Sequence, residues 1–493
     1  MSTASFLFAA SPILVLIGAA VGLILLESIY KTPHASLPKF LLAVAGPLLS
    51  GICAAWVAYE GLPNELLWDA PETPIWLREF YRSYRWDMLT QRSFLVLSFF
   101  LLVTVVFIES FLKDLHEISE IFALLLFAGA GMFVLVSAGN LLMLFMGLEL
   151  LSLPTYVLVG MRKNDLKSSE AALKYFLYGS FATVLLMLGI ALLYGKCGTL
   201  DLQAIAALIK TNFTSISGNS SVELPILSAF ILLLVAIGFK VGLAPYHLWL
   251  PDAYQGAPTP VTGFMGSAIK LAAFALALRV FAQTLLPLTQ STQVVMQGLA
   301  VLTLFWGNLA ALRQTDLKRM FAYSSIGHAG FLFLGLSTLG SEASDPQLDV
   351  QFYLMVYGLM FVGIFGIFSW IEHHKKAIDI DSVNGLGFQR PLMGLCFLIF
   401  LLSSAGIPPT AGFFAKYLLL VRMFASGKIA LVGLAILSSL LGVAYYLRVI
   451  AHLYMKAPVS PEISVPRPPV SAVIGIVLCA FALVYLAIVP STF

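Results

Sequence analysis

The sequence predicts an all-α polytopic membrane protein with about fourteen transmembrane helices. Of its 493 residues, 60% are hydrophobic and only 11% are charged, against roughly 45–50% and about 25% in an ordinary soluble domain. A soluble chain of this size would need far more charged residues to cover its surface. Most of the surface must therefore face lipid, which excludes a soluble globular enzyme.

Apolar runs of about 20 residues, long enough to cross a hydrocarbon core of about 30 Å, recur along the whole chain. No Lys or Arg precedes the first run, and Lys31 and Lys39 follow it, so we interpret it as a signal anchor and not as a cleaved signal peptide. The predicted helices are 11–29, 40–59, 94–112, 119–138, 140–160, 169–195, 224–247, 260–282, 294–312, 321–339, 351–372, 391–424, 429–454 and 470–489.

The loops predict the orientation, because short cytoplasmic loops collect Lys and Arg. The loop after the tenth run is acidic, with Glu342, Asp345 and Asp349, as an outer loop should be. An even number of crossings then places both termini on the outer side. The basic loops, which alternate with the others, carry Arg162, Lys163, Lys167, Arg313, Lys318, Arg319, Lys375, Lys376 and Arg390.

Two of the runs are interrupted by glycine and proline in corresponding ways. The seventh contains Gly242-Leu243-Ala244-Pro245, and the twelfth contains Gly406-Ile407-Pro408-Pro409. Proline removes a backbone donor and glycine permits the bend, so both helices should break inside the membrane. The two runs lie five helices apart, an odd shift, which predicts two five-helix repeats of opposite orientation, as in many ion transporters.

These repeats divide the chain into four predicted regions. The range 1–118 forms an N-terminal region of three helices, 119–282 the first repeat with helices four to eight, 294–454 the second repeat with helices nine to thirteen, and 455–493 the fourteenth helix.

Ionisable residues within the membrane are the candidate functional residues. Each costs at least about 2.5–3.5 kcal/mol on insertion scales, so each is a functional hypothesis by default. Lys240 directly precedes the first break and Lys416 follows the second. Lys174 lies roughly 10 Å from its basic loop. The complete set is Glu149, Lys174, Lys240, Lys270 and Lys416.

Two plainer interpretations compete with a functional one. A lysine close to the membrane surface can extend its ammonium group to the interface, an alternative that applies most to Lys174. A buried ion pair can also serve only helix packing. One carboxylate cannot neutralise four lysines, however, so some of the lysines should be neutral part of the time and able to pass a proton on.

We therefore predict a proton relay along a wet axis. Lys240, Lys270 and Lys416 are its sites, with the two lysines beside the breaks in equivalent places of the two halves. Glu149 and Lys174 form a modulating pair. His247 and His328 either bridge the gaps or are satisfied neutral donors. Lys318 and Arg319 are assigned no chemistry, and Asp252 is interpreted as a helix cap or as a proton-uptake group.

The sequence contains no pattern for a bound redox group, metal or nucleic acid. Cys53, Cys197, Cys396 and Cys479 stand far apart, without CxxC or Cys/His spacing, so an iron–sulfur or zinc site in this chain is not expected. The net charge of +3 is small and scattered, which argues against nucleic acid as a partner.

Four segments together resemble the antiporter-like membrane subunits of respiratory complex I, and their wording is most similar to the N-subunit family of NADH:quinone oxidoreductase. They are GLELLSLPTYVLVG from Gly147, GFKVGLAPYHLWLPDAYQGAPTPVTGFMGSAIK from Gly238, DLKRMFAYSSIGHAGF from Asp316 and GIPPTAGFFAKYLLL from Gly406. The family's glutamate on the fifth helix falls on Glu149, and its lysines on the sixth, seventh, eighth and twelfth helices fall on Lys174, Lys240, Lys270 and Lys416.

The resemblance implies a proton-translocating translocase subunit of the bacterial inner membrane, without a redox centre of its own. FMN, iron–sulfur clusters and quinone would belong to partner subunits. The expected partners are neighbouring antiporter-like subunits, small membrane subunits and the lipid bilayer. Multisubunit sodium/proton antiporters share most of the lysines and remain an alternative. A purely structural scaffold is a third possibility, in which neutralised lysines would leave proton transport intact.

Overall fold

The computed structural model describes residues 3–29, 37–60, 82–112, 117–214, 224–338, 347–375, 378–457 and 466–489. Every helix or strand assigned in these ranges is a helix, which confirms the predicted all-α class. Of the acidic loop, Glu342 and Asp345 lie outside the described residues, as does Lys376.

A helix, or a pair of helices, matches each of the fourteen predicted runs. Twelve are long and apolar enough to cross a membrane, and α15 together with the α18–α19 pair supplies the other two. Before the first break the helices are α1 (Thr3–Ile29), α2 (Leu37–Glu60), α4 (Met88–Leu112), α5 (Ile118–Val136), α6 (Leu141–Val159), α7 (Leu166–Cys197), α8 (Leu202–Thr214) and α9 (Leu224–Val241).

The rest of the chain begins with α10 (Trp249–Gly256) and a continuous helix with two π-helical segments. This helix consists of α11 (Thr259–Phe264), η2 (Met265–Ile269), α12 (Lys270–Ala277) and η3 (Leu278–Thr284). It is followed by α13 (Leu286–Ser291), α14 (Gln293–Leu312), α15 (Leu317–Leu336), α16 (Gln347–Lys375), η4 (Ile380–Val383), α17 (Leu386–Gln389), α18 (Pro391–Ala405), α19 (Ala411–Ala425), α20 (Ile429–Met455) and α21 (Val470–Ile488).

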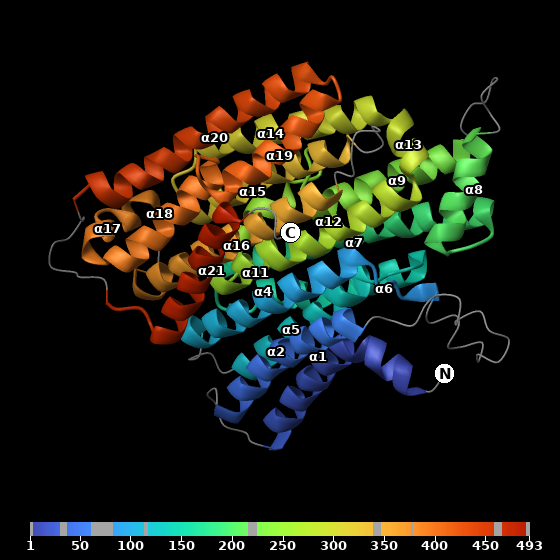
Figure 1. Ribbon diagram of the computed structural model, residues 1–493. Helices are drawn as coiled ribbons and strands as arrows, with labels where there is room; N and C mark the ends of the chain where they lie inside the picture. Colours follow the sequence, from blue (N-terminus) through green and yellow to red (C-terminus); the bar gives the residue numbers. More distant parts are fainter. Residues whose placement is uncertain are drawn as a thin grey trace.

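The long helices lie side by side in one bundle (Figure 1), with α1 and α2 along one edge and α20 along the opposite edge. Helix α16 occupies the centre, where it contacts α4, α11, α15, α18, α19 and α21. The apolar stretches of α16 and of the α11–η3 helix are completely buried, whereas only 28% of those of α7 and α20 are. The core therefore surrounds α16, and α7 and α20 form part of the outer surface of the bundle.

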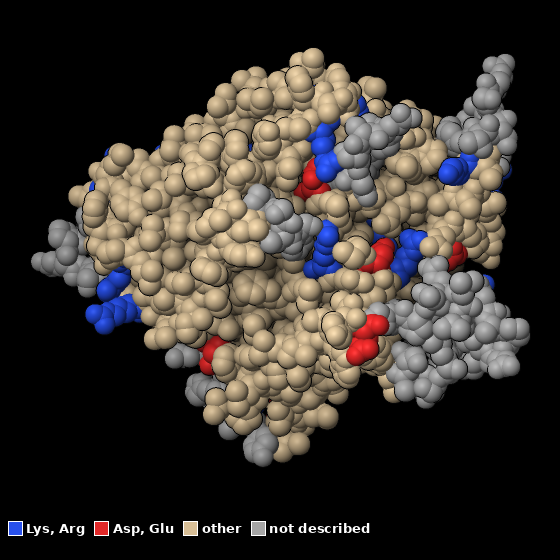
Figure 2. All heavy atoms as spheres, viewed as in Figure 1, with Lys and Arg blue, Asp and Glu red and all other residues tan. Residues whose placement is uncertain are grey.

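The outer surface of the bundle is strongly apolar. Phe181, Leu440 and Phe481 are each more than 60% exposed, and most of the face seen in Figure 2 carries neither acidic nor basic side chains. In water such a surface would drive aggregation, so the arrangement agrees with a multi-pass integral membrane protein.

Both predicted helix breaks are present, and they are built in the same way. Helix α9 ends at Gly242, which has a φ of +82°, and α18 ends at Gly406, with a φ of +77°. The N–H groups of Gly242 and Leu243 donate to the Gly238 carbonyl, at 3.0 and 2.8 Å. In α18, the N–H groups of Gly406 and Ile407 both donate to the Leu402 carbonyl. A left-handed glycine that ends a helix in this way satisfies carbonyls that would otherwise be orphaned. The repeat boundaries stay a prediction.

Ion pairs join the helices at the end of the bundle that carries the basic loops, the basic end. Arg162, between α6 and α7, holds both carboxylate oxygens of Glu372 on α16, at 3.0 and 2.8 Å. Lys318 of α15 lies 3.8 Å from Glu372 and donates to the Ala257 carbonyl at 2.7 Å. Lys318 is thus not an exposed loop residue, as the sequence suggested, but is only 3% exposed.

Candidate functional site

Lys240 lies in the last turn of α9 and is 6% exposed. Its ammonium group donates to the Ser152 hydroxyl of α6 at 2.7 Å. The rings of Tyr156, Tyr175 and Phe239 lie 5.6–5.9 Å from the same nitrogen. A hydroxyl group and aromatic faces thus replace water around this lysine, and none of these neighbours carries a full negative charge.

Glu149 and Lys174 lie in different surroundings. Glu149, on α6, accepts a hydrogen bond from Thr183 of α7 at 2.7 Å. The ammonium of Lys174 lies 2.6 Å from Glu170 and 2.8 Å from Asp252, and its side chain is 40% exposed. Lys174 precedes Thr183 by nine residues, which is about 13 Å along a helix. Both ion-pair partners of Lys174 are therefore at the basic end, and the expected pair with Glu149 does not form by direct contact.

Lys270 lies in the middle of the buried α11–η3 helix, directly after the π-helical segment η2, and is 3% exposed. It donates to the carbonyl and the hydroxyl of Ser325 on α15, at 2.6 and 2.5 Å. The ring of Tyr357 on α16 lies 5.1 Å from the ammonium. Lys270 therefore connects the eighth helix with α15 and the central α16.

His328 lies one turn beyond Ser325, on the same face of α15. Its Nδ1 is 2.9 Å from the Tyr353 hydroxyl of α16, and its Nε2 is 3.2 Å from the Tyr446 hydroxyl of α20. Both hydroxyl groups can donate or accept, whichever tautomer the ring adopts. His328 thus continues, toward α20, the line of polar groups that begins at Lys270.

Lys416 lies in α19 and reaches back to the end of α18. Its ammonium donates to the carbonyls of Ser404 and Ala405, at 3.1 and 3.0 Å, and to the Ser439 hydroxyl at 3.1 Å. A cation suits this position because the carbonyls at a helix C-terminus carry partial negative charge. Lys416 and His328 line the same small cavity, which connects the twelfth helix with the polar groups of α15.

His247 occupies the segment between α9 and α10 and is 2% exposed. Its ring packs edge-on against Trp306 of α14, with 5.5 Å between ring centroids. Its Nδ1 has no hydrogen-bond partner among the described residues. The structure therefore places His247 beside the first break but shows no direct contact with the lysines.

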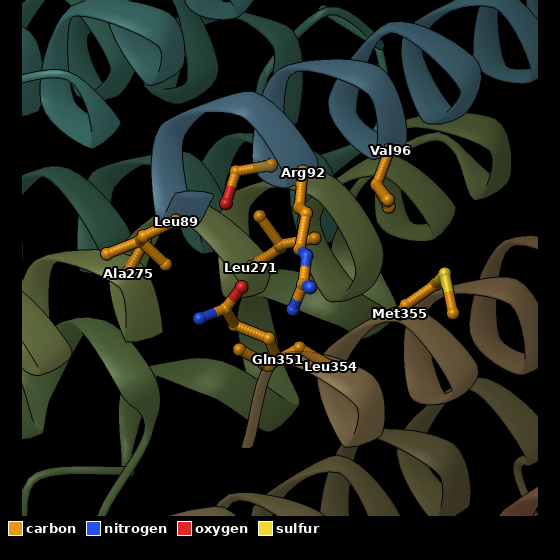
Figure 3. Close-up of a pocket in the computed structure, with 9 residues that line it drawn as sticks. Leu89, Arg92, Val96, Leu271, Ala275, Gln351, Leu354 and Met355 are labelled. Atoms are coloured by element: carbon orange, nitrogen blue, oxygen red, sulfur yellow. The ribbon is translucent and has the colours of Figure 1, made fainter. Parts of the chain in front are cut away.

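A further cavity lies between α4, α12 and α16. Arg92 from α4 and Gln351 from α16 point toward one another across it (Figure 3). Leu271 and Ala275, which follow Lys270 on α12, line the same space. The cavity lies on the side of Lys270 away from the basic end, and its polar groups suit ordered water.

Comparison with known proteins decides the family. Residues 138–442 match the family described as "NADH:quinone oxidoreductase/Mrp antiporter, TM". NADH-quinone oxidoreductase subunit N of Salinibacter ruber is 36% identical over 484 residues, which cover 96% of this chain and 91% of the relative. The chain belongs to the NADH-quinone oxidoreductase subunit N family. Subunit N of Bdellovibrio bacteriovorus is 42% identical over 69% of each chain.

A solved structure of respiratory complex I agrees with this membership. A chain of respiratory complex I from Thermus thermophilus is 32% identical, with a TM-score of 0.77 and 97% of each chain covered. A chain of the Mrp complex from Dietzia has a TM-score of 0.82, covers 99% of this chain and 95% of its own, but is 20% identical. The second likeness shows the fold alone.

The two breaks of this subunit N chain can be aligned at their glycines. When Gly242 is matched with Gly406, Ser404 falls opposite Lys240 and Asp252 falls opposite Lys416. The lysines therefore do not occupy equivalent sequence positions. They resemble each other in space instead, because Lys240 projects from the last turn of α9 and the Lys416 ammonium contacts the last carbonyls of α18.

Sequence reasoning missed most of the uncharged partners in this subunit N chain. Ser152, Ser325, Tyr353 and Tyr446 contact the buried lysines or His328. Ser152 follows Glu149 by three residues, and Ser325 precedes His328 by three, so helical spacing from a charged residue could have found these two. Nothing in the local sequence distinguishes Tyr353 or Tyr446 from other membrane tyrosines.

Proposed function

We propose that the chain is the proton-translocating membrane subunit of an NADH:quinone oxidoreductase, and that Lys240, Lys270 and Lys416 carry the protons. The observation that supports this most directly is a line of polar groups. It runs from Lys270 and its partner Ser325, through His328 one helical turn further along α15, to the cavity beside Lys416. It crosses the buried middle of the bundle. Burying polar and ionisable groups there costs free energy, so their presence indicates a function.

The contacts of the lysines suit proton transfer better than static ion pairing. An ammonium group only donates hydrogen bonds, whereas a neutral amine also accepts, so a hydroxyl partner can reorient and serve both states. A serine hydroxyl and at least one aromatic ring lie beside each of Lys240, Lys270 and Lys416. These neighbours do not fix the charge of the lysine, whereas a carboxylate would. Where neighbouring groups of this line do not touch, water in the cavities would carry the proton.

Each remaining site residue has a place in this proposal. Glu149 influences the charge of the relay at a distance, through the field around Lys240. Lys174, paired with Asp252, lies at the basic end, where protons enter from the inner side. His328 connects Lys270 with Lys416. His247, beside the first break, is a second candidate relay group.

The proposal also covers the surroundings of the chain. Redox chemistry at FMN, iron–sulfur clusters and quinone belongs to partner subunits, among them neighbouring antiporter-like and small membrane subunits. The basic end faces the inside of a bacterial inner membrane and both termini face the outside. The regions 119–282 and 294–454 act as inverted repeats. A sodium/proton antiporter subunit is disfavoured, because the likeness to the Mrp complex extends only to the fold.

The test uses the assembled complex in membrane vesicles. Lys240→Arg and Lys416→Arg keep the charge but cannot release a proton at accessible pH, whereas the Ala variants lose both charge and site. We expect all four to impair NADH-driven proton uptake strongly, with the complex still assembled and with no dependence on sodium. Lys163→Ala, in an exposed loop pair with Glu117, is the control and should behave as wild type. Normal pumping by both Arg variants would overturn the relay.

A further inference from the structure

One face of the central helix α16 carries a ladder of polar side chains. Asp349, Tyr353 and Tyr357 are spaced by four residues, so they lie above one another on the same face. Tyr357 is the ring neighbour of Lys270, and Tyr353 is a hydrogen-bond partner of His328. Both tyrosines thus belong to the lysine line, and Asp349 extends it by one turn toward the end of the bundle opposite the basic end.

Asp349 forms an ion pair with Arg422 of α19. The Nε and Nη2 atoms of Arg422 each donate to a different carboxylate oxygen of Asp349. Asp349 is 5% exposed, whereas the Arg422 side chain is 27% exposed. The carboxylate is therefore enclosed by the bundle, whereas part of the Arg422 side chain reaches the surface of the bundle.

Arg422 lies on the same helix, α19, as Lys416. It follows Lys416 by six residues on α19, which is about 9 Å along the helix. Two routes thus converge on the ion pair, one along α16 from His328 through Tyr353 and one along α19 from Lys416. A positive charge on Lys416 repels the guanidinium of Arg422, so the charge state of the lysine affects the ion pair.

We propose that the Asp349–Arg422 ion pair is the gate through which protons leave the second half of the chain. This inference rests on the proposed function and adds the outlet to it. While Lys416 is neutral, Arg422 occupies the Asp349 carboxylate and closes the outlet. A proton that arrives on Lys416 weakens the Asp349–Arg422 pair by repulsion. The Lys416 ammonium then gives its proton, through water, to the Asp349 carboxylate. Lys416 becomes a neutral amine and Asp349 a carboxylic acid, which releases the same proton to the exterior and pairs with Arg422 again.

A second ion pair at the same end, between Arg279 and Asp87, is an example of a fixed ion pair in this chain. Arg279 of η3 is completely buried and donates to Asp87, to the Val136 carbonyl and to the Thr90 hydroxyl. Its guanidinium is therefore fixed by several acceptors at once. Among the described residues, the Arg422 guanidinium donates to Asp349 alone, and its side chain is partly exposed. Arg422 can consequently leave its partner for water, which a gate requires.

The experiment compares two variants that break the same ion pair from opposite sides. Arg422→Gln removes the closing charge and leaves the carboxylate, so we expect vesicles with this complex to lose an imposed pH gradient several-fold faster, with quinone reduction retained. Asp349→Asn removes the accepting carboxylate, so we expect quinone reduction to fall several-fold in vesicles that stay tight. Arg422→Lys should remain close to wild type in both measurements. Glu117→Gln, in the exposed pair at the basic end, controls for surface charge.

A merely structural ion pair predicts that Arg422→Gln and Asp349→Asn behave alike, and that result, or wild-type behaviour of both, overturns the gate. If a single variant fails to assemble, the Asp349→Asn/Arg422→Gln double variant leaves no unpaired charge. Slow turnover in tight vesicles then supports the gate, and normal pumping refutes it. Lys416→Ala separates the two proposals. If it stops pumping while the ion-pair variants behave alike, only the gate is wrong; if none of these variants alters pumping, the proposed function fails as well.

Discussion

Gly406 is a position where one added methyl group reaches the proposed relay. A Cβ atom there would lie 2.9 Å from Cδ and 3.1 Å from Nζ of Lys416. At Gly242, in the other break, a Cβ would instead meet the apolar Leu250 side chain at 2.7 Å. The backbone is left-handed at both glycines, with φ of +77° and +82°. Gly406→Ala and Gly242→Ala therefore impose similar strain, but only the first displaces a relay lysine.

The contacts give the size of the effect. A left-handed alanine costs about 1–2 kcal/mol in either break, and a tight new contact adds about 1–3 kcal/mol. Lys416 is flexible, so it relieves the contact by moving away from the Ser404 and Ala405 carbonyls. A hydrogen bond from a charged donor contributes about 1.5–3 kcal/mol. The loss of one such bond shifts the equilibrium of the Lys416 side chain about tenfold or more from its bonded to its displaced position, since 1.4 kcal/mol corresponds to a factor of ten.

The assay measures NADH-driven proton uptake by vesicles, divided by the amount of assembled complex. We expect both variants to lower the abundance of the complex. Gly406→Ala should in addition lower proton uptake per complex about tenfold, while Gly242→Ala leaves uptake per complex close to wild type. Equal uptake per complex in the two variants would refute the reasoning, because it would mean that the place of the Lys416 ammonium does not affect transfer.

Two further predictions concern acidic residues. Glu149→Gln should lower proton pumping while Glu149→Asp keeps part of it, because the charge matters more than its reach; equal pumping by the two variants in complexes of normal abundance would contradict this. Asp87→Asn should reduce the stability of the complex by about 1–2 kcal/mol, because it leaves the Arg279 charge buried without its carboxylate. This is less than for a fully buried pair, since the Asp87 side chain is 38% exposed. Burial alone would raise the pKa of Asp87. The charge of Arg279 and the hydrogen bonds from Arg279 and Thr90 outweigh burial, so the pKa lies below its ordinary value of 3.8. The stabilisation is thus complete above that value and is lost as the pH falls through the lower folded pKa. Thermal melting should separate wild type from Asp87→Asn at pH 5–8 and less so in strong acid, and an unchanged difference in acid would count against the ion pair.

The sequence alone determined the membrane class, the number of crossings and the place of both helix breaks. These properties are local. Apolar length over about 20 residues decides whether a segment crosses the membrane, and glycine and proline act on the backbone within a turn of their own position. For the same reason Lys240, Lys270 and Lys416 could be singled out, since a charge within an apolar run is visible without a partner.

Only the tertiary structure decided what each charge meets. Ser152 lies 88 residues from Lys240, and Ser325 lies 55 residues from Lys270, so no local pattern connects them. Lys174 extends to Asp252 on the broken helix instead of to Glu149, and Lys318 is drawn into the bundle by Glu372. A buried polar group takes the partner that helix packing brings within about 3 Å. That packing depends on the side chains of all the neighbouring helices at once, so it cannot be predicted from the hydropathy of one segment.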